Sequence, residues 1–143
     1  MEYKSHIYSR KEARVLVLQA LCEYDSVGHD AMEVLERVFN EYEFENNFHI
    51  FAGDIVANAL ENFVSIDTII GELAPDWPLM QIAIVDRNIL RMAIAELEWC
   101  KEKVPEKVVL NEAVELAKRF GSESSPSFVN GVLGSYMKVG IAV

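Results

Sequence analysis

The sequence contains few of the residues that covalent cross-links, metal sites and catalytic centres require. It has three histidines and two cysteines, Cys22 and Cys100, which lie far apart and outside any C-x-x-C pair. This pattern excludes a zinc set and favours two small buried thiols in the reducing cytoplasm over a disulfide framework. No nucleophile–base combination or phosphate-binding loop accompanies the histidines. We therefore expect a binding protein and not an enzyme, with no cofactor and no metal.

Long apolar runs are absent as well. No uninterrupted apolar stretch approaches the roughly 20 residues that a membrane-spanning helix needs. The first ten residues, M-E-Y-K-S-H-I-Y-S-R, lack the apolar core of a signal peptide. Hydrophobic residues make up 51% of the 143 positions and are spread evenly. The chain therefore predicts one globular domain in the cytoplasm, without membrane association.

Positive charge is scarce, and the formal net charge is −10. Residues 20–80 contain thirteen carboxylates and a single cation, whereas the first nineteen residues have a positive balance. A net negative charge disfavours binding of nucleic acid. The first nineteen residues, which we call the basic arm, can nevertheless bind phosphate, while the acidic residues 20–80 bind a basic protein. Alternatively, the basic residues of the arm contact only solvent and bind no phosphate. The basic residues of this arm are Lys4, His6, Arg10, Lys11 and Arg14.

Apolar residues recur at helical spacing along the whole chain, and no segment shows the sustained alternation of a half-buried strand. Ser9 with Glu12, and Asp30 with Glu33, form capping arrangements for the first two helices. The expected helices run from Ser9 to Gly28, Asp30 to Tyr42, Asn47 to Phe63, Ser65 to Leu73, Leu79 to Trp99, Pro105 to Gly121, and from Ser125 onward. A short turn before Asp86 is an alternative for the start of the fifth, and Asn111 is an alternative cap for the sixth.

The segment Pro75-Asp76-Trp77-Pro78 is the clearest break between these helices. We predict an all-α fold of about seven helices in two small bundles. The bundles would cover about residues 1–75 and 76–143 of a single domain, residues 1–143.

Two positions in the C-terminal half suggest contacts with other molecules. Asp86 lies at the entry of the most apolar helix, where either the helix dipole or a partner can explain it. Phe128 falls off the inward stripe of the last helix, so it can stack on an unpaired base or pack at the surface. Arg91 and Glu96 interrupt the apolar helix, and buried ion pairs are the usual explanation for such charges.

Three blocks of the sequence resemble the NusB family of bacterial transcription antitermination factors. The first two run from Ala13 to Leu21 and from Val85 to Leu97. The third is N-E-A-V-E-L-A-K-R-F followed by F-V-N-G-V-L, near the C-terminus. The resemblance implies an all-α fold of two three-helix units. It also implies a protein that joins NusE, a small-subunit ribosomal protein, on the boxA element of nascent RNA in the elongation complex, notably in ribosomal RNA transcription.

The resemblance also implies roles for individual residues. Arg10, Lys11 and Arg14 match the family's arginine-rich RNA-binding motif, which Glu12 interrupts here, and Phe128 matches an aromatic near the RNA. Asp86 matches an acidic position at the NusE contact. Around Phe128, however, Ser124 and Ser127 stand where family members often have charged residues.

Two hypotheses follow from these observations. The chain is either an RNA-binding antitermination factor that acts with NusE, or an acidic helical protein–protein module without RNA binding. The oligomeric state stays open, with a homo-oligomer as one option.

Overall fold

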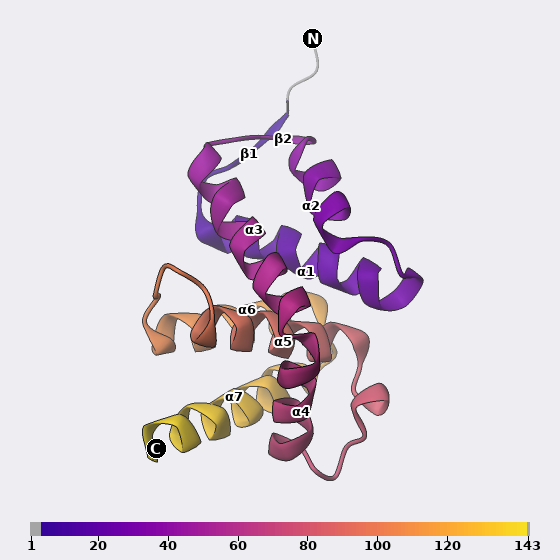
Figure 1. Ribbon diagram of the computed structural model, residues 1–143, viewed down its shortest axis with the longest axis vertical. Coiled ribbons are helices and arrows are strands. Elements are labelled where there is room, and N and C mark those ends of the chain that lie inside the picture. Colours follow the sequence, from indigo (N-terminus) through magenta and orange to yellow (C-terminus); the bar gives the residue numbers. More distant parts are fainter. Residues whose placement is uncertain (1–3, 143) are drawn as a thin grey trace.

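The computed structural model describes residues 4–142, which form mainly helices (Figure 1). In Figure 1, α1, α2 and α3 lie in the upper part and α4 to α7 in the lower part. The prediction of an all-α fold with about seven helices is confirmed, with one small sheet in addition. The elements are β1 (Ser5–Ile7), α1 (Arg10–Val27), α2 (Ala31–Phe39), β2 (Tyr42–Phe44), α3 (Asn46–Glu61), α4 (Phe63–Leu73), a 3₁₀ turn η1 (Leu79–Gln81), α5 (Ile84–Glu98), α6 (Glu106–Phe120) and α7 (Ser125–Ala142).

The ends of α1 and the start of α2 follow the capping residues in the sequence. Ser9 and Glu12 form a complete capping box at the start of α1. Gly28 ends α1 with a φ of 76°, in the left-handed region that glycine adopts without a steric cost. The Asp30 side chain then accepts hydrogen bonds from the backbone of Met32 and Glu33 and begins α2.

The small sheet corrects the sequence interpretation at two places. The second helix ends at Phe39, and Tyr42 belongs to β2 and not to the helix. β2 pairs with β1 in parallel, so that His6 lies opposite Glu43. His6 is therefore part of a strand, whereas the sequence pattern predicts only helices. Strands of three residues are too short for period-two alternation to be recognised.

A second correction concerns the boundary between α3 and α4. The expected third helix included Phe63, but α3 ends at Glu61 and α4 already begins at Phe63. Asn62, with a φ of −107° and a ψ of 23°, is the break between them. Ser65 is therefore not the residue that begins α4. The Phe63 ring lies beneath the Arg91 guanidinium at 4.3 Å, so a contact distant in sequence fixes its position.

Helix α5 lies at the centre of the molecule and is buried on nearly all sides, as its composition predicts. It packs against α1 and α3 of the upper group and against α4, α6 and α7 of the lower group. The segment of residues 74–78 that precedes it is not helical. Because α5 contacts both groups, the division into two subdomains stays a prediction.

A network of buried charges joins α1, α4 and α5. Arg87 and Arg91 of α5 both bind Asp25 at the end of α1, with nitrogen–oxygen distances of 2.7 and 2.8 Å. Arg91 also binds Asp67 of α4 at 2.8 Å. Burial alone would raise the pKa of Asp25, but hydrogen bonds from Arg87 and Asn88 and the charge of Arg91 outweigh it and lower the pKa to about 2. The network thus favours an ionised Asp25 in the folded protein.

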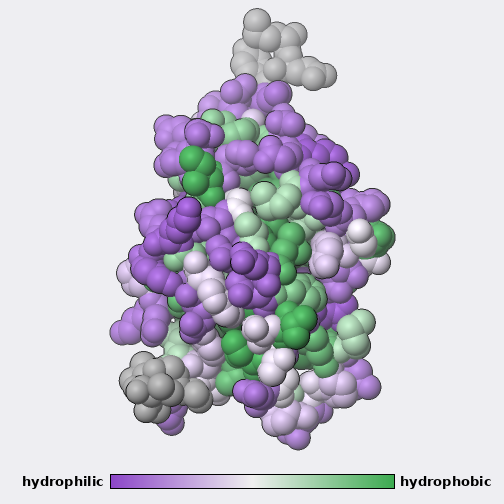
Figure 2. All heavy atoms as spheres, viewed as in Figure 1, coloured by the Kyte–Doolittle hydropathy of each residue, from purple (hydrophilic) through white to green (hydrophobic). Residues whose placement is uncertain are grey.

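Figure 2 shows one face of the molecule, on which apolar side chains run down the middle with hydrophilic ones on both sides. Helices α3 and α4 lie in front in this view. Ile50 of α3 and Val64 of α4 are exposed hydrophobic residues. This face therefore shows an apolar strip between hydrophilic side chains and is not uniformly hydrophilic.

The two cysteines behave as unreactive thiols. Cys100 is buried and Cys22 is half-buried. Burial is the largest cause that raises the pKa of these thiols, to about 12 for Cys100 and about 11 for Cys22. Both are therefore protonated at neutral pH.

None of the helices within residues 4–142 is long and apolar enough to cross a membrane.

Candidate nucleic-acid and partner interface

The start of α1 carries the basic residues that the sequence singles out, and Glu12 among them has a structural role. Its carboxylate accepts hydrogen bonds from the backbone N–H groups of Tyr8 and Ser9. These bonds satisfy donors that a helix N-terminus leaves without partners. Glu12 is therefore occupied by the helix cap, which explains why an acidic residue interrupts the basic cluster.

Arg14 points into the protein and not into solvent. Its guanidinium donates two hydrogen bonds to the Glu96 carboxylate of α5, at 2.9 and 2.5 Å. The side chains of Arg14 and Glu96 are only 5% and 2% exposed. The guanidinium also lies over the Phe51 ring of α3, 5.0 Å from its centroid. Arg14 therefore ties α1 to α3 and α5, and its guanidinium is inaccessible to a phosphate in this structure.

Arg10 also turns toward α3, but it stays near the surface. Its guanidinium lies over the same Phe51 ring at 4.9 Å and forms an ion pair with Glu102 in the linker between α5 and α6. The Arg10 side chain is 37% exposed. Of the two arginines, only Arg10 can therefore be reached from solvent.

Lys11 lies on another side of α1, next to the end of α6. It lines a hollow of about 290 Å³ together with Lys118 and Arg119. Arg119 also lines a second hollow, of about 200 Å³, with His6 of β1. α1 and β1 thus place Lys11 and His6 beside Arg119 of α6. We call Lys11, His6, Lys118 and Arg119 the basic surface.

Sequence reasoning missed Lys118 and Arg119 as members of this surface. They stand in the last turn of α6, where positive charge is favoured by the helix dipole and needs no further explanation. Glu112 and Glu115 also line the first hollow, and Lys118 forms an ion pair with Glu115 at 3.3 Å. Neither the sequence spacing nor the charge of α6 alone reveals that Lys11 lies beside them.

The turn between α6 and α7 places Phe128 near the start of α5. A Cβ atom at Gly121 would lie 2.5 Å from the Ser125 side chain, so this close approach requires glycine. Ser125 is buried and accepts a hydrogen bond from the Ser122 backbone at 2.8 Å. Phe128, one turn further along α7, is half-buried and packs against the core.

Phe128 and Asp86 line the same small hollow, of about 120 Å³, with Trp77. The Trp77 side chain is exposed, whereas Asp86 is 7% exposed. One carboxylate oxygen of Asp86, Oδ1, is buried and has no hydrogen-bond partner among residues 4–142. Such an oxygen is costly to leave without a donor. The hollow therefore places a carboxylate beside Phe128, and Oδ1 of this carboxylate is not reached from solvent.

The structure does not bring all the predicted RNA-binding residues together. On α5, Asp86 lies beside Phe128, and Glu96 binds Arg14. Asp86 and Glu96 are ten residues apart, which corresponds to about 15 Å along the helix. Phe128 therefore lies toward one end of α5 and the basic arm toward the other. Lys4 is exposed, immediately before β1.

Comparisons with known proteins agree on one family. Residues 11–138 match the NusB family. The chain is 46% identical to the transcription antitermination protein NusB of Dehalococcoides mccartyi, over 91% of this chain and 90% of the relative. Among solved structures, NusB of T. maritima superposes with a TM-score of 0.84 at 32% identity, over 92% of both chains. A structure of antitermination factors NusB and NusE in complex with dsRNA superposes with a TM-score of 0.82 at 30% identity, over 91% of this chain and 96% of that one.

Proposed function

The chain belongs to the NusB family, and from this premise we propose that it is a cytoplasmic transcription antitermination factor that binds boxA-type RNA together with NusE. It acts in the transcription elongation complex, notably on ribosomal RNA genes, and has no enzymatic role. The observation that carries the proposal is the similarity to NusB in a NusB–NusE–dsRNA structure over 91% of the chain.

The basic surface and Arg10 supply the contacts to the RNA backbone. Lys11, Lys118 and Arg119 are exposed and lie around one hollow, where neighbouring phosphates of a strand can meet them. Lys4 extends the positive charge along the arm, and the exposed His6 lies two residues further on. Each phosphate neutralised on a single strand contributes about −0.7 to the slope of log affinity against log salt. Three or four such contacts predict a slope of roughly −2 to −3.

Phe128 supplies a stacking contact at a distance from this surface. A stacked strand rises about 3.4 Å per nucleotide, so four or five nucleotides bridge a separation of about 15 Å along α5. An RNA element of at least this length is therefore needed to contact both the basic arm and Phe128. In this arrangement the cations contribute most of the affinity for RNA, and the Phe128 ring contacts a base.

We assign Asp86 to the contact with NusE, so that NusE would meet the RNA base at the hollow that Asp86 shares with Phe128. A basic ribosomal protein has cationic side chains that the negative charge of Asp86 attracts. Trp77 and Met80 expose apolar surface beside it, which suits the aromatic and methionine-rich character of protein interfaces. The acidity of residues 20–80 steers the encounter with such a partner.

The test is a titration of fluorescently labelled boxA-type RNA, with and without NusE, at several salt concentrations. Lys118→Ala and Lys107→Ala form a matched pair, because both remove one exposed lysine of α6 at positions about 16 Å apart. We expect Lys118→Ala to weaken binding for all RNA sequences alike and to reduce the steepness of the salt slope by about 0.7. Lys107→Ala should leave the slope unchanged.

Two results would contradict the proposal. Equal effects of Lys118→Ala and Lys107→Ala would mean that the basic surface does not hold the RNA. Absence of RNA binding by the wild-type chain, even with NusE present, would favour the acidic interaction module. The pairing of Arg10 and Arg14 with glutamates is the observation on which that alternative depends.

A further inference from the structure

The guanidinium of Arg10 already holds an anion in the folded protein. The Glu102 carboxylate forms an ion pair with this guanidinium, and the Phe51 ring packs against one face of the guanidinium. Carboxylate and phosphate bind a guanidinium through the same pairs of N–H donors. An anion that approaches Arg10 from solvent therefore competes with Glu102 for this guanidinium.

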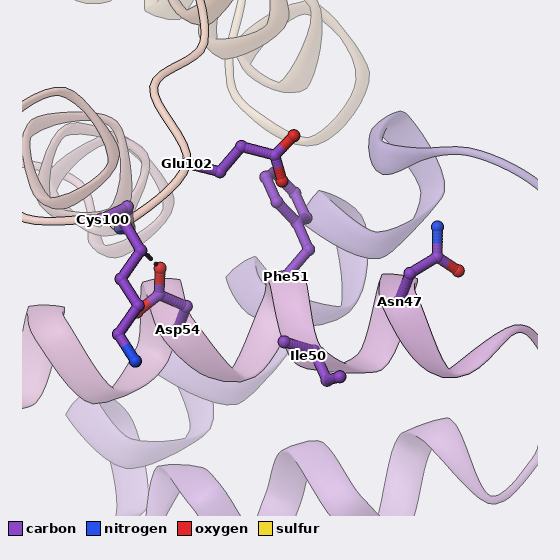
Figure 3. A pocket seen from close by; sticks show the side chains of 7 residues that line it. Asn47, Ile50, Phe51, Asp54, Cys100 and Glu102 are labelled. Atoms are coloured by element: carbon purple, nitrogen blue, oxygen red, sulfur yellow. Dashed lines mark hydrogen bonds between the residues drawn. The ribbon is translucent and has the colours of Figure 1, made fainter.

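The linker that carries Glu102 is fixed on both sides of this residue. The backbone N–H of Lys101 donates to Oδ2 of Asp54 on α3, at 3.0 Å. The Lys103 ammonium donates to the carbonyl oxygen of Glu98 at the end of α5, at 3.1 Å. Figure 3 shows the Glu102 side chain beside the Phe51 ring, at a hollow of about 440 Å³ between α3 and the linker. Glu102 is therefore presented to Arg10 by an anchored backbone.

The Glu102 side chain itself is 64% exposed, so it can rotate away without any change of the backbone. The neighbouring pair of Arg14 and Glu96 is different, because both side chains are buried and the pair joins two helices. Phosphate can thus replace the carboxylate at Arg10 but not at Arg14. An exposed ion pair of this kind is weak, which makes the exchange reversible.

We propose that Glu102 occupies the position of an RNA phosphate at Arg10 and lowers the RNA affinity of the basic arm by competing for that guanidinium. This proposal rests on the RNA-binding function proposed above. Glu102 is then an internal competitor that the RNA backbone displaces, and it adjusts affinity without contacting a base.

The experiment compares Glu102→Gln with Glu61→Gln in RNA titrations. Both substitutions remove one exposed carboxylate, but Glu61 lies about 15 Å along α3 from Phe51. Each is also made in an Arg10→Ala background, which completes a double-mutant cycle. The probe is single-stranded boxA-type RNA with NusE held at one saturating concentration, and circular dichroism confirms that each variant is folded.

We expect Glu102→Gln to bind RNA about two- to fivefold more tightly than Glu61→Gln when Arg10 is present. In the Arg10→Ala background the two variants should bind alike. Equal affinities with Arg10 present would overturn the proposal, even if the wild-type chain binds RNA and the proposed function stands. Wild-type protein that fails to bind RNA would overturn both, and the titration separates these two results.

Discussion

Removal of one partner from the Arg14–Glu96 pair should strongly destabilise the fold. Both side chains are almost fully buried, and two hydrogen bonds join them. Arg14→Ala leaves the Glu96 carboxylate buried without its counter-charge, which typically costs about 3–5 kcal/mol. With an m-value of about 2 kcal/mol/M, this cost lowers the urea midpoint by about 1.5–2.5 M. Urea unfolding followed by circular dichroism measures it, and a loss below about 1 kcal/mol would refute the argument.

Removal of both partners should have a much smaller effect. Arg14→Met combined with Glu96→Leu replaces the pair by apolar side chains of similar volume. Such replacements are often neutral or stabilising, because no charge then has to be desolvated. The double variant should therefore unfold near the wild-type midpoint.

The double variant also separates the structural role of Arg14 from a role in RNA binding. Because the Arg14 guanidinium is inaccessible, the variant should bind RNA with the wild-type salt slope. A slope less steep by about 0.7, in a variant as stable as the wild type, would mean that Arg14 contacts a phosphate. Its burial in the free protein would then not describe the RNA-bound state.

Four further predictions concern other parts of the molecule. Leu116→Ala should lower the free energy of unfolding by about 2–5 kcal/mol in urea titrations, since Leu116 is buried in the α6 stripe. The pKa of Asp25 is lowered from 3.8 to about 2, so its contribution to stability is present above about pH 4 and is lost as the pH falls toward 2. Asp25→Asn should therefore flatten the dependence of stability on pH in this range. Asp86→Asn should weaken NusE association in calorimetry without changing the circular dichroism spectrum. Phe128→Ala should weaken RNA binding by about 1–3 kcal/mol in the RNA titration, with little change in salt slope, because stacking carries no charge.

The sequence predicted those features of the fold that depend on local signals. Ser9 begins α1, and Leu116 lies inward on α6, because capping and helical periodicity act within a few residues. The boundaries that failed depend on distant contacts. Phe63 belongs to α4 and contacts Arg91 of α5, and Tyr42 belongs to a strand whose partner lies in the N-terminal arm. Neither contact leaves a periodic pattern in the sequence.

The candidate site shows the same limit. The sequence groups Arg10, Lys11 and Arg14 in one basic arm. The contacts of Arg10 and Arg14, however, lie on α3, on α5 and in the linker between α5 and α6. Glu96 is 82 positions away from Arg14 in the sequence, and spacing gives no indication of their contact. Lys118 joins Lys11 only through the packing of α6. Charge patterns along one helix identify a basic segment, but the tertiary structure decides which cations are free to bind.

The parallel pairing of β1 with β2 has a consequence for the affinity with which the arm can hold RNA. The pairing fixes His6 opposite Glu43, next to Arg119 of the basic surface. The arm thus loses its conformational freedom when the protein folds, and not at the moment of contact. A disordered basic tail would have to be ordered by the RNA itself, with an entropic cost at each encounter. Here His6 of β1 belongs to a preorganised surface, and Tyr42 of β2 lines the same hollow as His6 and Arg119, so changes in β2 should alter the affinity for RNA.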